Sequence, residues 1–156
     1  METRKTTPGL RIFEKYSVRN AGGRNHRHGL DSGAMLKENH LRVFHGLKTI
    51  ERLKEKLPLL TGLEVEVTNL EEFKEAIKFS PDIIMLDNFT KEDIKLAIKY
   101  KIDKQSATKI EVSGNITLEN LKDFAGLALD FVSSGALIHK AEWADMSLQI
   151  TFKEKR

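Results

Sequence analysis

Apolar residues along this chain recur with two alternating periods, and these periods predict a series of strands and helices. Short apolar runs typical of buried strands occupy 34–37, 63–67, 82–86, 110–112 and 131–133. Segments with helical spacing separate them, at 41–57, 70–79, 91–100 and 118–124. Thr90 and Thr117 stand where helix N-caps are expected. Because strands that alternate with helices form parallel sheets, the sequence predicts an α/β fold.

The two ends of the chain add further predicted elements. Residues 2–6 have the pattern of a charged strand, and Pro8 suits the first turn of a helix that ends at Gly22. The apolar positions of that helix are Leu10, Phe13, Tyr16 and Val18. Leu148, Ile150 and Phe152 alternate with polar residues and predict a closing strand. With about six strands the chain is too short for a full eight-unit barrel of about 250 residues, and periodicity alone leaves an open sheet and a partial barrel as alternatives.

Composition narrows the class of protein. The 156 residues, 40% of them hydrophobic, suit one folded domain. Lys and Arg outnumber Asp and Glu by 26 to 23, and this small excess does not indicate a nucleic-acid partner. The absence of cysteine excludes disulfides and thiolate metal sites and agrees with a reducing cytoplasm. No run of about 18 apolar residues occurs, so we expect a soluble cytoplasmic protein with no membrane partner.

Polar residues follow each predicted strand, at the ends that meet along one edge of a parallel sheet. In chain order they are Lys37, Glu66, Asp87-Asn88, Ser113-Gly114-Asn115 and Ser134-Gly135-Ala136 with His139. If residues 2–6 form the first strand, Arg4 and Lys5 leave it toward the same edge. The sequence therefore predicts that cations, acids and two glycine-containing turns gather there.

The acids of this edge suit a divalent cation. Glu64 and Glu66 share one face of their strand, and for Glu64 a solvated face and a charged barrel interior are both open. Asp87 ends a strand that is apolar on both faces, where a polar residue is either a turn residue or a ligand. Two carboxylates on neighbouring strands suit Mg²⁺, which completes its shell with phosphate oxygens and water.

The two glycine turns suit a phosphate group. The first, 113–115, precedes a helix, whose backbone N–H groups and dipole attract anions. Gly135 and Ala136 can do the same opposite it, with His139 within reach. Each turn taken alone is also compatible with an ordinary strand-to-helix connection. Together they predict a phosphomonoester site.

The basic residues Arg4, His26, Arg27 and Lys37 suit a small dicarboxylate, because the planar arginine group binds a carboxylate through two hydrogen bonds. Three of them lie in the glycine-rich segment 22–40, which is otherwise typical of a solvated basic loop. Nucleic acid is not expected, since no aromatic residue is interleaved for stacking. No HxxxH or HExxH motif occurs, so zinc is not expected. His40 and His45 are interpreted as structural, and Phe73, Phe131 and Trp143 as core or contact residues.

Seven short motifs in this order resemble one known family: ETRKTTPGLR, NHRHGL, LKENH, EVEV, LDN, SGN and GALIH. They resemble the C-terminal part of the quinolinate phosphoribosyltransferases, the carboxylating nicotinate-nucleotide pyrophosphorylases. The resemblance covers nearly all of the chain. It implies an incomplete six-stranded α/β barrel without the N-terminal domain that precedes it in the family.

The resemblance also implies an activity and its partners. The family transfers a phosphoribosyl group from phosphoribosyl pyrophosphate to quinolinate with decarboxylation, which gives nicotinate mononucleotide, CO₂ and pyrophosphate for NAD biosynthesis. It implies Mg²⁺ as the cofactor and a homo-oligomer, a dimer or larger. Because the N-terminal domain would cover the barrel mouth, the chain alone is expected to turn over slowly or not at all.

The family roles transfer residue by residue. Arg4, His26, Arg27 and Lys37 resemble the quinolinate-binding cluster, and Lys5 resembles the pyrophosphate contact. Glu66 and Asp87 resemble the residues on the ribose and Mg²⁺ side. The 5′-phosphate side would be formed by Ser113, Gly114, Asn115, Gly135, Ala136 and His139. Of these residues Lys5, Lys37, Glu66 and Asp87 are the predicted catalytic residues.

Three positions depart from the family pattern, and two alternatives to quinolinate transfer remain. Asn115 stands where the family has a second glycine, Ala128 where it commonly has glycine and Glu38 where it has aspartate. A phosphoribosyltransferase-like family associated with molybdate transport shares much of the pattern, so the acceptor is open. A truncated, non-catalytic subunit that still binds anions is the other alternative.

Overall fold

The computed structural model describes residues 1–44, 46–142 and 144–151. Its elements in chain order are α1 (Arg11–Asn20), β1 (Ala34–Leu36), α2 (Glu38–Val43), α3 (Thr49–Lys56), β2 (Leu63–Val67), α4 (Leu70–Ala76), the 3₁₀ helix η1 (Ile77–Phe79), β3 (Ile83–Asp87), α5 (Lys91–Asp103), β4 (Lys109–Ser113), the 3₁₀ helix η2 (Leu121–Phe124), β5 (Phe131–Val132) and α6 (Ala136–His139). None of the helices in these ranges has the length and apolar character of a membrane span.

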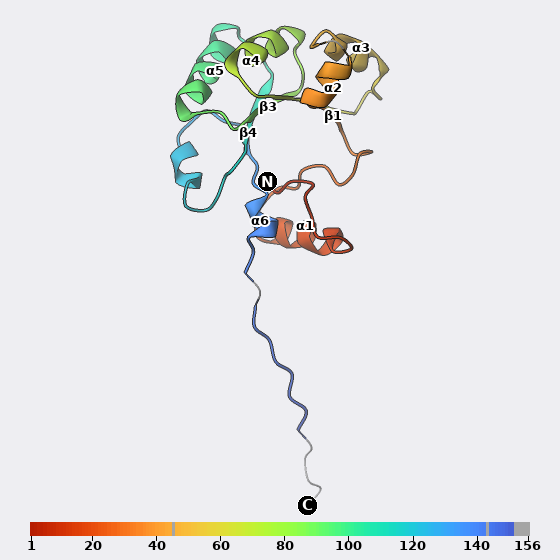
Figure 1. Cartoon of the computed structure of the whole chain (residues 1–156), viewed down its shortest axis with the longest axis vertical. Helices are drawn as coiled ribbons and strands as arrows, with labels where there is room; N and C mark the ends of the chain where they lie inside the picture. Colours follow the sequence, from red (N-terminus) through yellow and green to blue (C-terminus); the bar gives the residue numbers. More distant parts are fainter. Residues whose placement is uncertain (45, 143, 152–156) are drawn as a thin grey trace, which may run out of the picture.

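The five strands form one parallel sheet in the order β1-β2-β3-β4-β5. This order has no reversal, whereas the strand order of a doubly wound open sheet does reverse. The connecting helices α2 to α5 lie together on one side of the sheet, and α1 lies on the other side (Figure 1). The α/β class is therefore confirmed, and the sheet is a segment of a TIM-like barrel.

The two faces of the sheet differ sharply in polarity. The face toward the helices is apolar, and its buried side chains include Val65, Ile84 and Ile110. Residues of the opposite face are brought side by side by the strand register, which pairs Glu66 with Met85 and Met85 with Glu111. In a barrel this second face points inward. The apolar face forms the core, and the inner face carries the polar groups.

Two predicted helices differ from the structure. The segment 41–57 forms two helices, because Gly46 adopts φ +109 and its amide donates to the Leu41 carbonyl at 2.8 Å, which ends α2. His45, which lies beside this break, is outside the described residues. The segment 118–124 forms only the short η2. Of the predicted N-caps, Thr90 accepts the Asp93 amide at 3.1 Å, whereas η2 has no side-chain cap.

The predicted strands at the two ends do not form. Residues 2–6 are not a strand, although Met1 lies beside β5, where its amino group donates to the Val132 carbonyl at 2.5 Å and its carbonyl accepts the Ser134 amide at 2.9 Å. Residues 144–151 have no regular structure, and Phe152 and Trp143 lie outside the described residues. The described sheet therefore has five strands where six were expected.

The first helix forms as predicted, but its packed side is different. Phe13 and Tyr16 are 67% and 68% exposed, whereas Lys15 is buried. Lys15 forms an ion pair with the equally buried Glu2. The helix is therefore held against the protein by a charged pair and not by the apolar stripe that predicted it.

Candidate functional site

A polar cavity of about 380 Å³ lies at the carboxyl ends of β3 and β4. Eight residues predicted from the sequence line it: Lys5, Asp87, Ser113, Gly114, Asn115, Gly135, Ala136 and His139. Thr3, Asn88, Ile116, Thr117, Ser133, Ser134 and Lys140 complete its wall. We call it the strand-end cavity. It brings both predicted glycine turns together with a lysine, a carboxylate and a histidine.

The first turn of this cavity is built around Gly114, whose φ is +97. A Cβ there would lie 2.3 Å from Asn88 Oδ1, so no other residue fits without moving the neighbouring strand end. Asn115 follows with φ +50, a left-handed conformation that asparagine tolerates better than most residues, and its side-chain amide donates to Asn88 Oδ1 at 3.0 Å. Asn115 thus fits the turn in place of the family's glycine.

The second turn packs equally closely. A Cβ on Gly135 would lie 2.9 Å from Nε2 of His139, so the imidazole rests directly against the backbone of the turn. The Ser134 hydroxyl donates to the Ile116 carbonyl and accepts the Ala136 amide at 3.2 Å, which connects the second turn to the segment after the first. The two turns therefore form one connected wall.

The inner face beside the strand-end cavity carries the predicted acids and Lys37. The Lys37 ammonium forms an ion pair with the Glu66 carboxylate. A residue predicted to bind the acceptor is therefore paired with a residue predicted to bind Mg²⁺. Asp87 accepts the Asn88 side-chain amide at 2.9 Å through Oδ2, and Oδ1 is not used in that contact. A carboxylate that lines a cavity large enough for phosphate groups fits one ligand of Mg²⁺.

Arg27 is held tightly on the same face. Its guanidinium donates to the Gly33 carbonyl at 3.3 Å and contacts Sδ of Met35 at 2.9 Å, and its Nε is buried without a hydrogen-bond partner. Burial lowers the pKa of Arg27 from its ordinary value, while Glu64 acts in the opposite direction and Arg4 adds to the lowering. The guanidinium stays charged, and it is a donor group with unused capacity.

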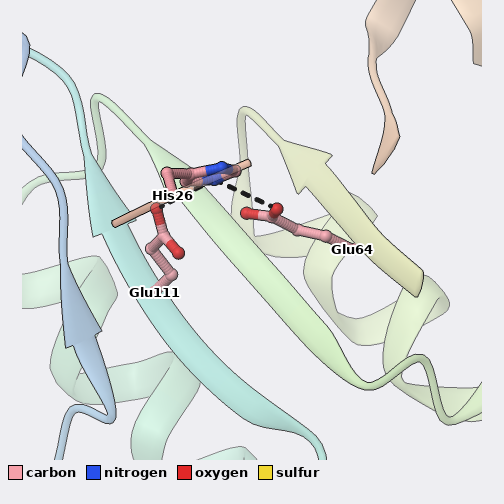
Figure 2. Close-up of side chains that lie close together, drawn as sticks. All are labelled: His26, Glu64 and Glu111. Carbon is pink, nitrogen blue, oxygen red and sulfur yellow. Dashed lines mark ion pairs between the residues drawn. The ribbon is translucent and has the colours of Figure 1, made fainter. Parts of the chain in front are cut away.

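His26 lies between two glutamates that come from different strands (Figure 2). Its Nε2 is 3.2 Å from Glu64 Oε2 on β2 and 3.8 Å from Glu111 Oε1 on β4. The Ser133 hydroxyl donates to the same Glu111 oxygen at 2.5 Å. All three side chains are at most 9% exposed. We call His26, Glu64 and Glu111 the His–Glu cluster.

The backbone of His26 is fixed by the buried pair that holds α1. Lys15 Nζ donates to the His26 carbonyl at 3.0 Å, and the His26 amide donates to Glu2 Oε1 at 3.1 Å. Sequence reasoning missed Glu2, Lys15 and Glu111. Glu111 had a detectable signal, because it lies between apolar Ile110 and Val112 in the same alternation that marked Glu64.

Electrostatics in the His–Glu cluster favours bound protons. The hydrogen bond to Glu64 raises the pKa of His26, against the effect of burial, and the charge of Glu111 raises it further. Burial raises the pKa of Glu111 to about 7, and repulsion from Glu64 adds to this, while Ser133 and His26 act against it. Near neutral pH the Glu111 carboxyl is therefore partly protonated.

The His–Glu cluster is also the group of potential metal ligands in the described ranges, since its three ligand atoms lie within 4.8 Å of one another. Glu66 and Asp87, which the sequence suggested for Mg²⁺, are outside it. The Mg²⁺ ligands therefore stay a prediction.

A larger cavity, of about 680 Å³, lies at the opposite edge of the sheet. It includes Pro81, Asp82, Tyr100, Lys104 and Thr108, none of which belongs to the predicted site. Parallel α/β folds place their chemistry at the carboxyl ends of the strands. We therefore assign function to the smaller strand-end cavity and the inner face beside it.

These features are the ones expected of an anion-binding site at the carboxyl ends of the strands of an α/β barrel, and comparison with known proteins identifies the family. The family model described as quinolinate phosphoribosyl transferase, C-terminal domain, matches residues 1–149. The chain belongs to this family.

Relatives and solved structures agree with the family assignment. The chain is 44% identical over 151 residues to a probable nicotinate-nucleotide pyrophosphorylase [carboxylating] of Synechocystis sp., a match that covers 96% of this chain and 51% of the relative. A protein of the same description from Methanocaldococcus jannaschii is 41% identical over 152 residues and covers 95% and 54%. The crystal structure of NadC from Streptococcus pyogenes superposes with a TM-score of 0.87 at 44% identity, over 95% of this chain and 51% of that one. The chain spans about half the length of these relatives.

The raised pKa of Glu111 predicts how stability depends on pH. Because the folded protein binds this proton more tightly than the unfolded chain, the fold gains stability below the usual value of 4.5 relative to pH above 7, and loses it as pH rises between those values. The raised pKa of His26 acts in the same direction. We expect the free energy of unfolding to fall by about 2 to 3 kcal/mol from this source, and Glu111→Gln to remove most of the fall.

Urea unfolding at a series of pH values from about 5 to 8 measures this effect. Glu71→Gln, on the exposed surface of α4, is the matched control and should keep the wild-type dependence. A Glu111→Gln protein with the same pH dependence as the wild type would show that Glu111 has an ordinary pKa.

Proposed function

We propose that this chain forms the barrel domain of a phosphoribosyltransferase that uses quinolinate and phosphoribosyl pyrophosphate. The reaction gives nicotinate mononucleotide, CO₂ and pyrophosphate, a step in NAD biosynthesis. The observation that carries the proposal is the strand-end cavity, where two closely packed glycine turns meet Lys5, Asp87 and His139. Relatives that match nearly the whole chain are described as carboxylating nicotinate-nucleotide pyrophosphorylases, which supports the same reaction.

The strand-end cavity suits the phosphoribosyl donor. The turns at Gly114 and Gly135 allow backbone to approach a phosphate closely, because neither has room for a side chain. Lys5 supplies a positive charge on the same cavity for the pyrophosphate group. Asp87, with Glu66 nearby on the inner face, would hold Mg²⁺, which neutralises the leaving pyrophosphate when it is bound.

The inner face suits the acceptor. Arg27 offers a half-buried guanidinium whose Nε is buried and unpaired, and a carboxylate is the group that such a donor binds best. Lys37, now paired with Glu66, is partly exposed and can exchange that partner for a substrate carboxylate. Arg4 adds positive charge beside Arg27, and the His26 ring accepts the Arg27 backbone amide.

The chemistry requires alignment more than a nucleophilic side chain. The ring nitrogen of the acceptor attacks C1 of the ribose as pyrophosphate leaves, so the bond to nitrogen forms while the bond to the leaving oxygen breaks. The site holds the two reactants in line, which is a large part of the rate enhancement in such reactions. Carboxylates near the ribose stabilise the positive charge that develops on its ring.

We further propose a homo-oligomer in the cytoplasm. Leu10, Ile12, Phe13 and Tyr16 of the segment 10–16 are all exposed, and such an apolar surface favours association. The cysteine-free sequence suits a reducing compartment.

The acceptor assignment predicts a selective effect of Arg27. With quinolinate, phosphoribosyl pyrophosphate and Mg²⁺ supplied, formation of nicotinate mononucleotide tests the reaction, and calorimetry tests each ligand. Arg27→Ala should weaken quinolinate binding far more than donor binding and lower turnover by about 10² to 10³. The chain should be assayed alone and together with a separately expressed N-terminal half of a full-length relative. Turnover alone is expected to be low, because an open site weakens charge contacts.

Two results would contradict this assignment. Unchanged quinolinate affinity in Arg27→Ala removes Arg27 from the acceptor site. Binding of both ligands without any turnover, alone or with the N-terminal half, favours the non-catalytic alternative, whereas donor binding without quinolinate binding favours a different acceptor.

The Mg²⁺ assignment predicts a selective effect of Asp87. Asp87→Asn keeps the shape of the side chain and removes its charge, so donor binding should lose its dependence on Mg²⁺ while the fold is retained. Asp123→Asn, in η2, is the control for removal of one negative charge. Calorimetric titration of the donor with and without Mg²⁺ measures the effect. A normal Mg²⁺ dependence in folded Asp87→Asn would make Asp87 a turn residue.

A further inference from the structure

The inner face poses an electrostatic problem, because a site for an anionic acceptor contains two deeply buried carboxylates. Glu64 and Glu111 are each buried, and neither takes part in the proposed reaction. Among the described residues, the ion pairs of both are formed with His26 and not with a lysine or arginine. Buried charges without firm counter-charges destabilise a fold, so their presence here indicates a role other than stability.

The hydrogen bonds around His26 define where its proton lies. The backbone amide of Arg27 donates to Nδ1 at 2.7 Å, so Nδ1 is an acceptor. The ring proton is therefore on Nε2, which faces Glu64 Oε2 at 3.2 Å and Glu111 Oε1 at 3.8 Å. Glu64 Oε1 and Glu111 Oε2 remain buried without a partner. The ring is therefore held at both of its nitrogens, and each glutamate keeps one carboxylate oxygen that can accept a further hydrogen bond.

The orientation of His26 passes directly to Arg27. The two residues are adjacent in the chain, and the backbone amide of Arg27 donates a hydrogen bond to the His26 ring. From that backbone position the Arg27 guanidinium reaches Gly33, directly before β1, and Met35 within it. A change in the tilt of the ring would move this amide and the guanidinium with it.

We propose that Glu64 and Glu111 are positioning residues that hold the His26 ring, with its proton on Nε2, and thereby aim Arg27 at the acceptor carboxylates. The positioning of Arg27 toward an acceptor rests on the proposed function, whereas the hold on His26 does not. Glu64 Oε2 lies 3.2 Å from the protonated Nε2, and Glu111, fixed by Ser133, lies on the other side of the ring. In metal sites, residues that orient a ligand histidine in this way change metal affinity by about 10-fold to 100-fold, and we expect an effect of the same order here.

The charges around the His–Glu cluster predict a signature of this role. Glu64 faces His26 and Arg27, and Glu111 faces His26 and the Met1 amino group. Arg4 lies close to Arg27, and the Lys15–Glu2 pair lies behind the loop that carries His26. A dicarboxylate that binds to Arg27 brings negative charge toward Glu111 and so favours the protonated form of this carboxyl. Acceptor binding near neutral pH should therefore take up a proton.

The test compares Glu64→Gln and Glu111→Gln with the wild type, and Glu71→Gln on the surface of α4 is the control. Nitrogen-15 NMR of the histidine rings first measures His26 in the free protein. We expect an Nε2-protonated ring with a raised pKa in the wild type and the control, and a lower pKa with exchange between the two ring forms in Glu64→Gln. An unchanged His26 ring in both cluster variants would overturn the proposal.

Calorimetry of quinolinate in buffers of different ionisation enthalpy then measures affinity and proton uptake. We expect a 10-fold or greater loss of affinity in Glu64→Gln, loss of proton uptake in Glu111→Gln and unchanged donor affinity in both. If the wild type does not bind quinolinate, the proposed function fails while the NMR result still decides the hold on His26. If micromolar Mn²⁺ broadens the His26 signals in the wild type but not in Glu111→Gln, the cluster is a metal site and the proposal is wrong.

Discussion

The contact between His26 and the two buried glutamates of the inner face is the constraint on which the rest of the site depends. Glu64 and Glu111 come from strands separated by β3, and the imidazole that pairs with both comes from a loop before β1. That loop is held by a second buried pair, Lys15 with Glu2, which also holds α1 against the protein. Because a buried charge that loses its partner destabilises the fold, these contacts fix the position of the loop. They also fix the direction in which its cationic side chains point.

The two faces of the sheet have different roles: one forms the core that stabilises the fold, and the other carries the polar residues of the site. The helices α2 to α5 cover an apolar, buried face of the sheet (Figure 1). The opposite face carries the acids and the cations paired with them. Consecutive strand order makes this possible, because every crossover leaves the inner face uncovered. The glycine turns at Gly114 and Gly135 then complete the edge where phosphate groups would meet backbone.

Much of the fold could be predicted from the sequence, because periodicity reports local structure. The strands β2 and β3 and the turn at Gly114 follow from alternation and from glycine placement. The break at Gly46 was missed because the apolar spacing continues across it. Glu2 and Lys15 were missed because each is defined by its partner 13 positions away, and hydrophobic periodicity carries no information about such pairs. Glu111 stands in an apolar alternation that marks it as inward-facing, but its pairing with His26 is not visible in that pattern. The exposed face of α1 was misread for the same reason, since Lys15 and not Phe13 holds the helix.

We expect ligands to bind at the inner face and the strand-end cavity, and not in the larger cavity at the opposite edge. Backbone amide NMR of the labelled chain, titrated with quinolinate and then with inorganic phosphate, tests this most directly. We predict that quinolinate shifts the signals of Arg27 and Lys37, and that phosphate shifts those of Gly114 and Gly135. Shifts confined to the residues around Pro81 and Lys104, which line the larger cavity, would contradict the account.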